Sequence, residues 1–160
     1  MKYKFVLDEN VFKHALNRVD KYNKPDDSAM NLLRDISNNC HRIILDKKLN
    51  RVFINVLEKL KSTKAERNDR FLFALMKIKI NGQKYLFQDY VAKDLEDFQG
   101  IENMPDDDAF MAKLAIEEGA HYIVTSDENF ETAIKNNDFL ACQKIFSLDV
   151  KEALKKAKEN

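Results

Sequence analysis

Glycine is scarce in this chain, and its scarcity excludes the commonest phosphate-binding loops. The 160 residues include only three glycines, Gly82, Gly100 and Gly119. No two of them are close enough to form the G-x-x-x-x-G-K loop of ATP- and GTP-binding proteins or the G-x-G-x-x-G loop of dinucleotide-binding proteins. We therefore expect no nucleotide cofactor held by either loop.

Cysteine and histidine are also few. Cys40 and Cys142 are the only cysteines, too few for a disulfide framework or a four-cysteine zinc site. The three histidines show neither H-x-x-x-H nor H-x-H spacing, which argues against structural zinc. No signal peptide is visible, and the longest apolar run, residues 71–76, is too short to span a bilayer. These features predict a cytoplasmic protein with reduced thiols and no membrane attachment.

An excess of positive charge is absent as well. Lysine plus arginine number 27 and aspartate plus glutamate number 27, so the formal net charge is +0. This balance excludes a strongly basic, non-specific nucleic-acid binder but leaves room for a local basic patch. Hydrophobic residues make up 44%, which is enough for one core in a chain of this size. Since there are no repeats and no flexible linker, we predict a single domain over residues 1–160.

Short apolar runs alternate with helical patterns along the chain. Residues 3–7, 43–45 and 122–124 are typical of buried strands, and residues 84–87 and 144–146 are weaker strand candidates. This alternation predicts an α/β fold. The expected architecture is a three-layer α/β/α sandwich around a central, mostly parallel sheet of about four or five strands.

Apolar residues at helical spacing predict the helices between these strands. The clearest helical stripe consists of Leu49, Val52, Phe53, Val56, Leu57 and Leu60. Further helices are expected after Asp8, after the cluster Asp26-Asp27-Ser28, over residues 65–78, from Asp108 to Gly119, and from Val150, where Asp149 and Glu152 form a capping box.

Three of the predicted strands run into an aspartate, namely Asp8, Asp46 and Asp127. In parallel α/β sheets, ligands bind at the carboxyl ends of the strands, near the point where the strand order reverses. Carboxylates gathered there repel one another unless a cation lies between them. Mg²⁺ and Mn²⁺ prefer oxygen ligands, and all-carboxylate sites for these ions usually act on phosphates. The sequence therefore favours metal-dependent hydrolysis of a phosphodiester.

Three stretches of the chain resemble the motifs of PIN-domain nucleases. Residues 5–12 are similar to the first motif, in which an apolar strand runs into aspartate, a small hydroxyl residue and asparagine. Residues 106–115 resemble the third motif, an aspartate that opens a helix. Residues 121–127 resemble the fourth, a strand followed by threonine, any residue and aspartate. The order and separations fit, and the resemblance covers residues 2 to about 153.

This resemblance implies a PIN-like fold and a metal-dependent endoribonuclease with Mg²⁺ or Mn²⁺ as cofactor. Carried over position by position, Asp8, Asp108 and Asp127 are the catalytic residues and metal ligands, and Asn10 and Thr125 brace them by hydrogen bonds. Many relatives are toxins of toxin–antitoxin pairs, and others process ribosomal RNA. The implied partners are an RNA substrate, an antitoxin protein and a second copy of the chain in a homodimer.

The second motif of the family is not matched. It places a glutamate on the helix after the second strand, where this chain has residues 49–53 without an acidic side chain. Glu58 comes about two turns too late, roughly 9–10 Å along the helix axis. Asp46 or Glu9 is a candidate replacement as metal ligand, and Asp106 is a further supporting carboxylate. We expect a weakened metal site or a catalytically degenerate protein.

Structural explanations stand beside these functional ones. Asp8 could cap the helix that follows it, and Asp127 could be an ordinary turn residue. Asp106 and Asp107 could complement a helix dipole.

The basic residues near the proposed site have two explanations as well. Lys47, Lys48 and Arg51 could contact an RNA backbone or form a solvated helix face. The apolar run at residues 71–76 is explained either by the core or by a dimer surface.

Two functions other than a nuclease also stay open. The missing glutamate is compatible with a PIN-like module that binds RNA or a protein without catalysis. A haloacid-dehalogenase-type phosphatase also uses an aspartate after the first strand, but it needs an acid two residues later, where this chain has Asn10. A phospho-receiver would need a late lysine after a strand, and this lysine is missing near residues 145–146.

Overall fold

The computed structural model describes residues 1–61, 85–88 and 104–159. The described strands are β1 (Lys4–Leu7), β2 (Arg42–Asp46), β3 (Tyr85–Gln88), β4 (Tyr122–Val124) and β5 (Phe146–Leu148). The described helices are α1 (Glu9–Asn17), α2 (Ser28–Asn38), α3 (Lys47–Lys61), α5 (Asp106–Glu118), α6 (Glu128–Lys135), α7 (Asp138–Cys142) and α8 (Val150–Lys158). The helix predicted at residues 65–78, with its apolar run at 71–76, lies outside the described residues.

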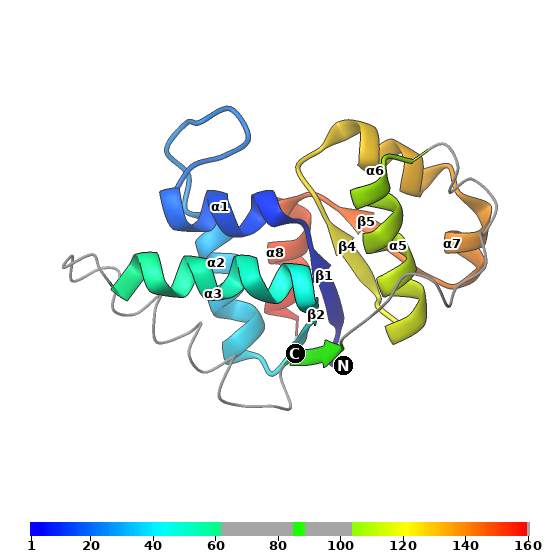
Figure 1. Ribbon diagram of the computed structural model, residues 1–160, viewed down its shortest axis with the longest axis horizontal. Coiled ribbons are helices and arrows are strands. Elements are labelled where there is room, and N and C mark those ends of the chain that lie inside the picture. Colours follow the sequence, from blue (N-terminus) through cyan, green and yellow to red (C-terminus); the bar gives the residue numbers. More distant parts are fainter. Residues whose placement is uncertain (62–84, 89–103, 160) are drawn as a thin grey trace.

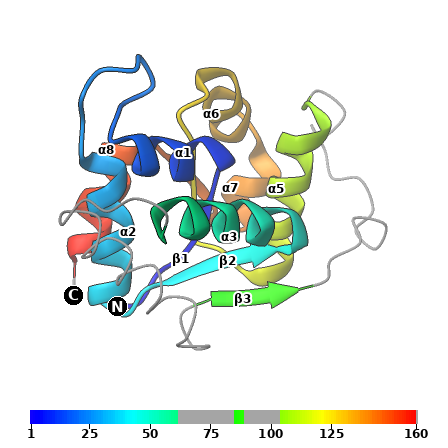
Figure 2. The same ribbon diagram turned by 60° about the vertical axis from the view of Figure 1, so that its left-hand side comes forward.

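The described strands form one sheet in the order β3-β2-β1-β4-β5, and every neighbouring pair is parallel. Figure 2 shows β3, β2 and β1 in this succession. The chain builds outward from β1 to β3 and then returns to the other side of β1 for β4. The strand order therefore reverses between β1 and β4, which is where doubly wound sheets bind their ligands.

Helices cover both faces of this sheet. Connections between parallel strands are right-handed. Helices that connect strands on the β3 side of β1 therefore lie on the opposite face of the sheet from helices that connect strands on the β5 side. Figure 1 shows α1, α2, α3 and α8 on one side of the sheet and α5, α6 and α7 on the other. The predicted α/β/α sandwich with a mostly parallel sheet is confirmed.

The central strands of the sheet are buried on both faces, and helix residues pack around them to complete the core. Phe5, Val6 and Leu7 of β1 are successive residues, and each exposes no more than 1% of its surface. Ile123 and Val124 of the adjacent β4 are fully buried. This two-sided burial explains why the central strands are continuous apolar runs rather than alternating patterns.

Two of the predicted helix ends are confirmed. Gly119 ends α5 in the left-handed conformation, with φ of 63°, which glycine adopts without strain. The capping box at α8 forms as expected: Asp149 Oδ1 accepts from the N–H of Glu152 at 2.8 Å, and Asp149 N–H donates to the Glu152 carboxylate at 3.0 Å.

The last strand begins two residues later than predicted, at Phe146 rather than at Lys144. Lys144 has φ of 57°, a left-handed conformation that no strand accommodates. The N–H of Ile145 donates to the carbonyl of Leu140 at 3.0 Å, so this residue completes the end of α7 instead of joining the sheet.

Two short helices, α6 and α7, were not predicted from the sequence. The buried side chains of α6 are Phe130 and Ile134, and that of α7 is Leu140. So few buried residues make too short a stripe for helical periodicity to be recognised.

Candidate active site

The pairing of β1 with β4 places two predicted site residues side by side. Leu7 lies opposite Val124, and the N–H of Asp8 donates to the carbonyl of Val124 at 2.9 Å. The hydroxyl of Thr125, which is fully buried, donates to Asp8 Oδ2 at 2.9 Å and accepts from the N–H of Asp127 at 3.0 Å. Thr125 therefore connects the end of β1 to the start of α6.

Helix α5 brings the third predicted aspartate to the same place. A cleft of about 190 Å³ at this edge of the sheet is lined by Asp8 and Asn10 from the start of α1, Asp108 from the first turn of α5, and Asp127 from the end of β4. Leu49 of α3 also lines it. The fold thus gathers three aspartates from distant parts of the sequence around one cleft.

Two carboxyl groups in this cleft, those of Asp108 and Asp8, have raised pKa values. The pKa of Asp108 is raised to about 6, first by burial and then by the negative charges of Asp127, Asp8 and Asp107. The pKa of Asp8 is also raised, chiefly by burial and to a smaller extent by Asp127, although the hydrogen bond from Thr125 acts in the opposite direction. The side chain of Asp108 forms no hydrogen bond or ion pair with the described residues.

The cleft is not a ready-made metal centre. Across residues 1–61, 85–88 and 104–159, no group of three His, Cys, Asp or Glu side chains is close enough to hold a metal ion as it stands. The donor set of Asp8, Asp108 and Asp127 nevertheless consists of carboxylate oxygens, which are the ligands that Mg²⁺ and Mn²⁺ prefer. Their mutual repulsion is the electrostatic condition that a divalent cation relieves.

The structural explanations hold for some of these aspartates and fail for others. Asp8 occupies the N-cap position of α1, but its side chain makes no capping hydrogen bond. Asp127 does cap α6, because its Oδ1 accepts from the N–H groups of Asn129 at 2.9 Å and Phe130 at 3.3 Å. The N-cap residue of α5 is Pro105, which has no side-chain acceptor.

The sequence analysis selected Asp106 as a supporting carboxylate, but the structure places its neighbour in the cleft. Asp106 is exposed and does not line the cleft, whereas Asp107 does. The sequence contained a signal for this choice. Asp107 lies three and four residues before Phe110 and Met111, which also line the cleft, so the three share one helix face.

The candidates for replacing the missing glutamate lie in different environments. Glu9 lines the cleft, but it forms an ion pair with Lys13 at 2.9 Å, one turn along α1. Glu58 is exposed on α3 and does not line the cleft. Asp46 is the last residue of β2, and its side chain lies outside the described residues, so its role stays a prediction.

The predicted basic contacts lie at the start of α3. Arg51 is exposed, two residues beyond Leu49, which lines the cleft. Lys47 and Lys48 form the beginning of the helix, and their side chains lie outside the described residues. The first turn of α3 contains no acidic residue and begins with two lysines. Their positive charge opposes the helix dipole instead of complementing it.

In the described ranges, no helix has both the length and the apolar character needed to cross a membrane. Comparison of the chain with protein-family models, with curated proteins and with solved structures found no match. The similarity to PIN domains therefore rests on the three sequence motifs.

Proposed function

We propose that this protein is a Mg²⁺- or Mn²⁺-dependent endoribonuclease with a PIN-like active site. The observation that carries the proposal is the convergence of Asp8, Asp108 and Asp127 on one cleft at the switch point of the sheet. The raised pKa values of Asp8 and Asp108 support a site that needs a cation rather than a surface of solvated charges.

In this proposal Asp8, Asp108 and Asp127 hold the metal ion. When bound, such an ion activates water and neutralises charge at the scissile phosphate. Thr125 orients Asp8 through its 2.9 Å hydrogen bond, and Asn10, which lines the same cleft, is the second residue proposed to brace the metal ligands.

The pKa of Asp108, about 6, predicts how the metal site responds to pH. A proton and the cation compete for this carboxylate, so the affinity for metal falls as the pH drops through 6.

The missing glutamate of the second motif makes the proposed site weaker than a complete one. Leu49 stands at the start of α3 where that motif has its acidic helix, and it lines the cleft with an apolar side chain. We therefore expect the protein to need a higher metal concentration than a site with four carboxylates.

A cleavage assay with matched variants tests the proposal. The purified protein should cut single-stranded RNA in Mg²⁺ or Mn²⁺ and not in EDTA, and Asp8→Asn should abolish the cleavage. Asp138→Asn is the matched control, because this exposed aspartate also lies in the first turn of a helix but outside the cleft.

Calorimetry with Mn²⁺ gives a readout that does not depend on cleavage. Binding to the parent protein should be lost in Asp108→Asn and kept in Asp138→Asn. An absence of binding heat at millimolar Mn²⁺ would refute the metal site.

A catalytically degenerate RNA- or protein-binding module is the second candidate. The absence of a ready-made group of three metal ligands in the described part of the chain favours it, together with the missing glutamate. It predicts RNA binding at low salt without cleavage, unaffected by Asp127→Asn. Trapping of Asp8 by beryllium fluoride would instead indicate a phosphatase of the haloacid-dehalogenase type.

The partners implied by the resemblance belong to the same proposal. They are an RNA substrate, an antitoxin protein and a second copy of the chain, in the cytoplasm. Light scattering of the purified protein tests the homodimer, and co-purification with the product of an adjacent gene tests the antitoxin.

A further inference from the structure

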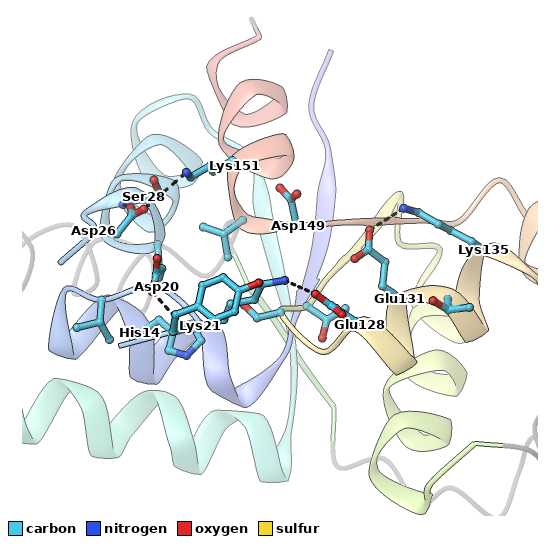
Figure 3. A pocket seen from close by; sticks show the side chains of 17 residues that line it. His14, Asp20, Lys21, Asp26, Ser28, Glu128, Glu131, Lys135, Asp149 and Lys151 are labelled. Carbon is cyan, nitrogen blue, oxygen red and sulfur yellow. Dashed lines mark hydrogen bonds and ion pairs between the residues drawn. The ribbon is translucent and has the colours of Figure 1, made fainter. Parts of the chain in front are cut away.

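A second and larger pocket adjoins the cleft. It has a volume of about 500 Å³ and is lined by the loop between α1 and α2, by α6 and by the start of α8 (Figure 3). Thr125, whose hydroxyl contacts Asp8, lines this pocket as well. On α1, Asn10 lines the cleft and His14 lines the pocket, and one helical turn separates them, roughly 6 Å along the axis. A strand of RNA with its phosphate in the cleft would place a neighbouring nucleotide at this pocket.

The charges in the pocket do not favour a phosphate. Five carboxylates and three lysines line it. Each lysine is already paired with a carboxylate, as the dashed lines in Figure 3 show: Lys21 with Glu128 at 2.8 Å, Lys135 with Glu131 at 2.6 Å, and Lys151 with Asp26 at 3.9 Å. The excess of negative charge disfavours an anion and suits a neutral group that carries N–H donors.

Two carboxylates of the pocket remain outside these ion pairs. Asp20 accepts backbone N–H groups of its own loop through Oδ1, and Asp149 accepts the N–H of Glu152 through Oδ1. The second oxygen of each carboxylate makes no further bond among the described residues. A ligand with amino groups therefore finds two acceptors in the pocket.

An aromatic ring stands at the edge of the same pocket. Tyr22 lines it and exposes 66% of its surface, which is unusual for so large an apolar side chain. Its loop is ordered by local bonds, because Asp20 Oδ1 accepts from the N–H groups of Tyr22 at 2.8 Å and of Lys24 at 3.0 Å. The ion pair of Lys21 with Glu128 fastens the loop to α6. The backbone of the loop is thus held in place, Lys21 Nζ lies 5.2 Å from the centre of the Tyr22 ring, and the ring remains exposed to solvent.

We propose that this pocket binds one unpaired nucleobase of a single-stranded RNA substrate, stacked on Tyr22. Stacking on an exposed aromatic ring is the usual way in which proteins hold single-stranded bases. The acceptor oxygens of Asp20 and Asp149 favour bases with an exocyclic amino group, namely adenine, cytosine and guanine, over uracil. The proposal rests on the proposed ribonuclease function and adds the base specificity of that site.

Binding of short RNA in the absence of cleavage tests this pocket. Fluorescently labelled oligoadenylate and oligouridylate are titrated in EDTA with the parent protein, Tyr22→Ala, Tyr22→Phe and Phe146→Ala. Phe146 is the matched control, because it is also an exposed aromatic residue, 51% exposed, and does not line the pocket. An oligoadenylate that contains 2-aminopurine reports stacking directly through the quenching of its fluorescence.

The proposal predicts a specific pattern of affinities. Tyr22→Ala should weaken binding of oligoadenylate by about five- to a hundredfold and abolish the quenching, whereas Tyr22→Phe and Phe146→Ala should bind like the parent. Oligouridylate should bind more weakly than oligoadenylate, and Asp20→Asn combined with Asp149→Asn should reduce this difference. The double variant is interpreted after circular dichroism shows that it is folded.

The result distinguishes this proposal from the proposed function. Equal affinities of the parent and Tyr22→Ala would overturn the nucleobase pocket, even if the protein cleaves RNA. Binding in EDTA that depends on Tyr22, together with no cleavage in Mg²⁺ or Mn²⁺, would support the pocket and contradict the nuclease. An absence of binding to either oligonucleotide in EDTA would overturn the pocket, whereas the cleavage assay in Mg²⁺ or Mn²⁺ decides the nuclease.

Discussion

The ionisable side chains at the amino ends of the strands (the amino edge of the sheet) differ in their surroundings from those at the carboxyl ends (the carboxyl edge). At the amino edge, His41 is fully buried, yet its Nδ1 accepts from the N–H of Tyr3 at 3.0 Å and its Nε2 lies 3.0 Å from the carbonyl of Ala157. His121 likewise accepts from the N–H of Lys4 at 3.0 Å. At the carboxyl edge, Asp8, Asp108 and Asp127 line one cleft, and burial and the neighbouring negative charges raise the pKa of Asp108.

This contrast shows which edge serves stability and which edge serves a ligand. A histidine whose Nδ1 accepts a hydrogen bond is neutral and donates from Nε2, so His41 ties the start of β1 to the end of α8. Burial lowers the pKa of His41, which keeps it in this neutral form. Repelling carboxylates, in contrast, cost folding energy, and proteins retain such groups where function requires them.

The largest expected effect comes from breaking the carboxyl edge. Asp108→Asn should lower kcat/KM for single-stranded RNA in Mn²⁺ by at least about a hundredfold, because it removes a charged ligand from the proposed metal site. Initial rates on a labelled oligonucleotide measure the loss, with Asp138→Asn as the control that should retain activity. Full activity of Asp108→Asn would mean that the convergence of aspartates has no catalytic meaning.

Breaking the amino edge should destabilise the protein instead. His41→Ala leaves the N–H of Tyr3 and the carbonyl of Ala157 without their buried partner and opens a cavity, which should cost about 2–4 kcal/mol of unfolding free energy. Urea denaturation followed by circular dichroism measures this loss. The neighbouring exposed residue provides the control, since Arg42→Ala should change the midpoint only slightly. A midpoint as high as that of the parent would contradict the structural role of His41.

A smaller effect is expected at the residue that supports the carboxyl edge from within. Thr125→Val removes the hydroxyl that donates to Asp8 and accepts from the N–H of Asp127, at a cost of about 1–2 kcal/mol in the same urea assay. Thr125→Ser keeps the hydroxyl and should be nearly neutral by comparison. If valine and serine destabilise equally, the methyl packing rather than the hydrogen bonds supports this edge.

The site residues that could be predicted from the sequence are those that follow the ends of strands. Asp8 and Asp127 come after apolar runs, and a parallel sheet aligns the carboxyl ends of its strands at one edge. Asp108 was placed with them only through the resemblance, because its position depends on how α5 packs after the sheet has formed. Asp107 lines the cleft and Asp106 does not, because successive residues along a helix are about 100° apart around its axis.

The remaining features depend on contacts that no local pattern encodes. The pocket beside Tyr22 is held together by the ion pair of Lys21 with Glu128, which are 107 positions apart in the chain. The hydrogen bonds of His41 and His121 likewise join residues that are far apart in sequence, and a histidine before a strand has no periodicity that would reveal its partners.

The smallest expected effect is on the pH dependence of the unfolding free energy, which differs between the two edges and is measured with EDTA present. The pKa of Asp108 is about 6 in the folded protein against an ordinary value of 3.8, so between these values the folded chain binds more protons than the unfolded chain. The contribution of Asp108 to stability therefore falls as the pH rises from about 4 to 6. Because this carboxylate is partly exposed, solvent screening reduces the expected cost to about 1 kcal/mol.

The lowered pKa of His41 has the opposite sign, since its contribution to stability falls as the pH drops below 6.5. His41 is present in both the parent and Asp108→Asn, so its contribution cancels in the difference between their stabilities. This difference therefore reports on Asp108 alone. Urea midpoints should converge near pH 4 and separate near pH 7, with Asp108→Asn the more stable. Adding Mn²⁺ should then raise the urea midpoint of the parent toward that of Asp108→Asn, because binding of the ion to the folded state stabilises the parent. A difference that stays constant across this range would mean that the pKa of Asp108 is not raised in the folded protein.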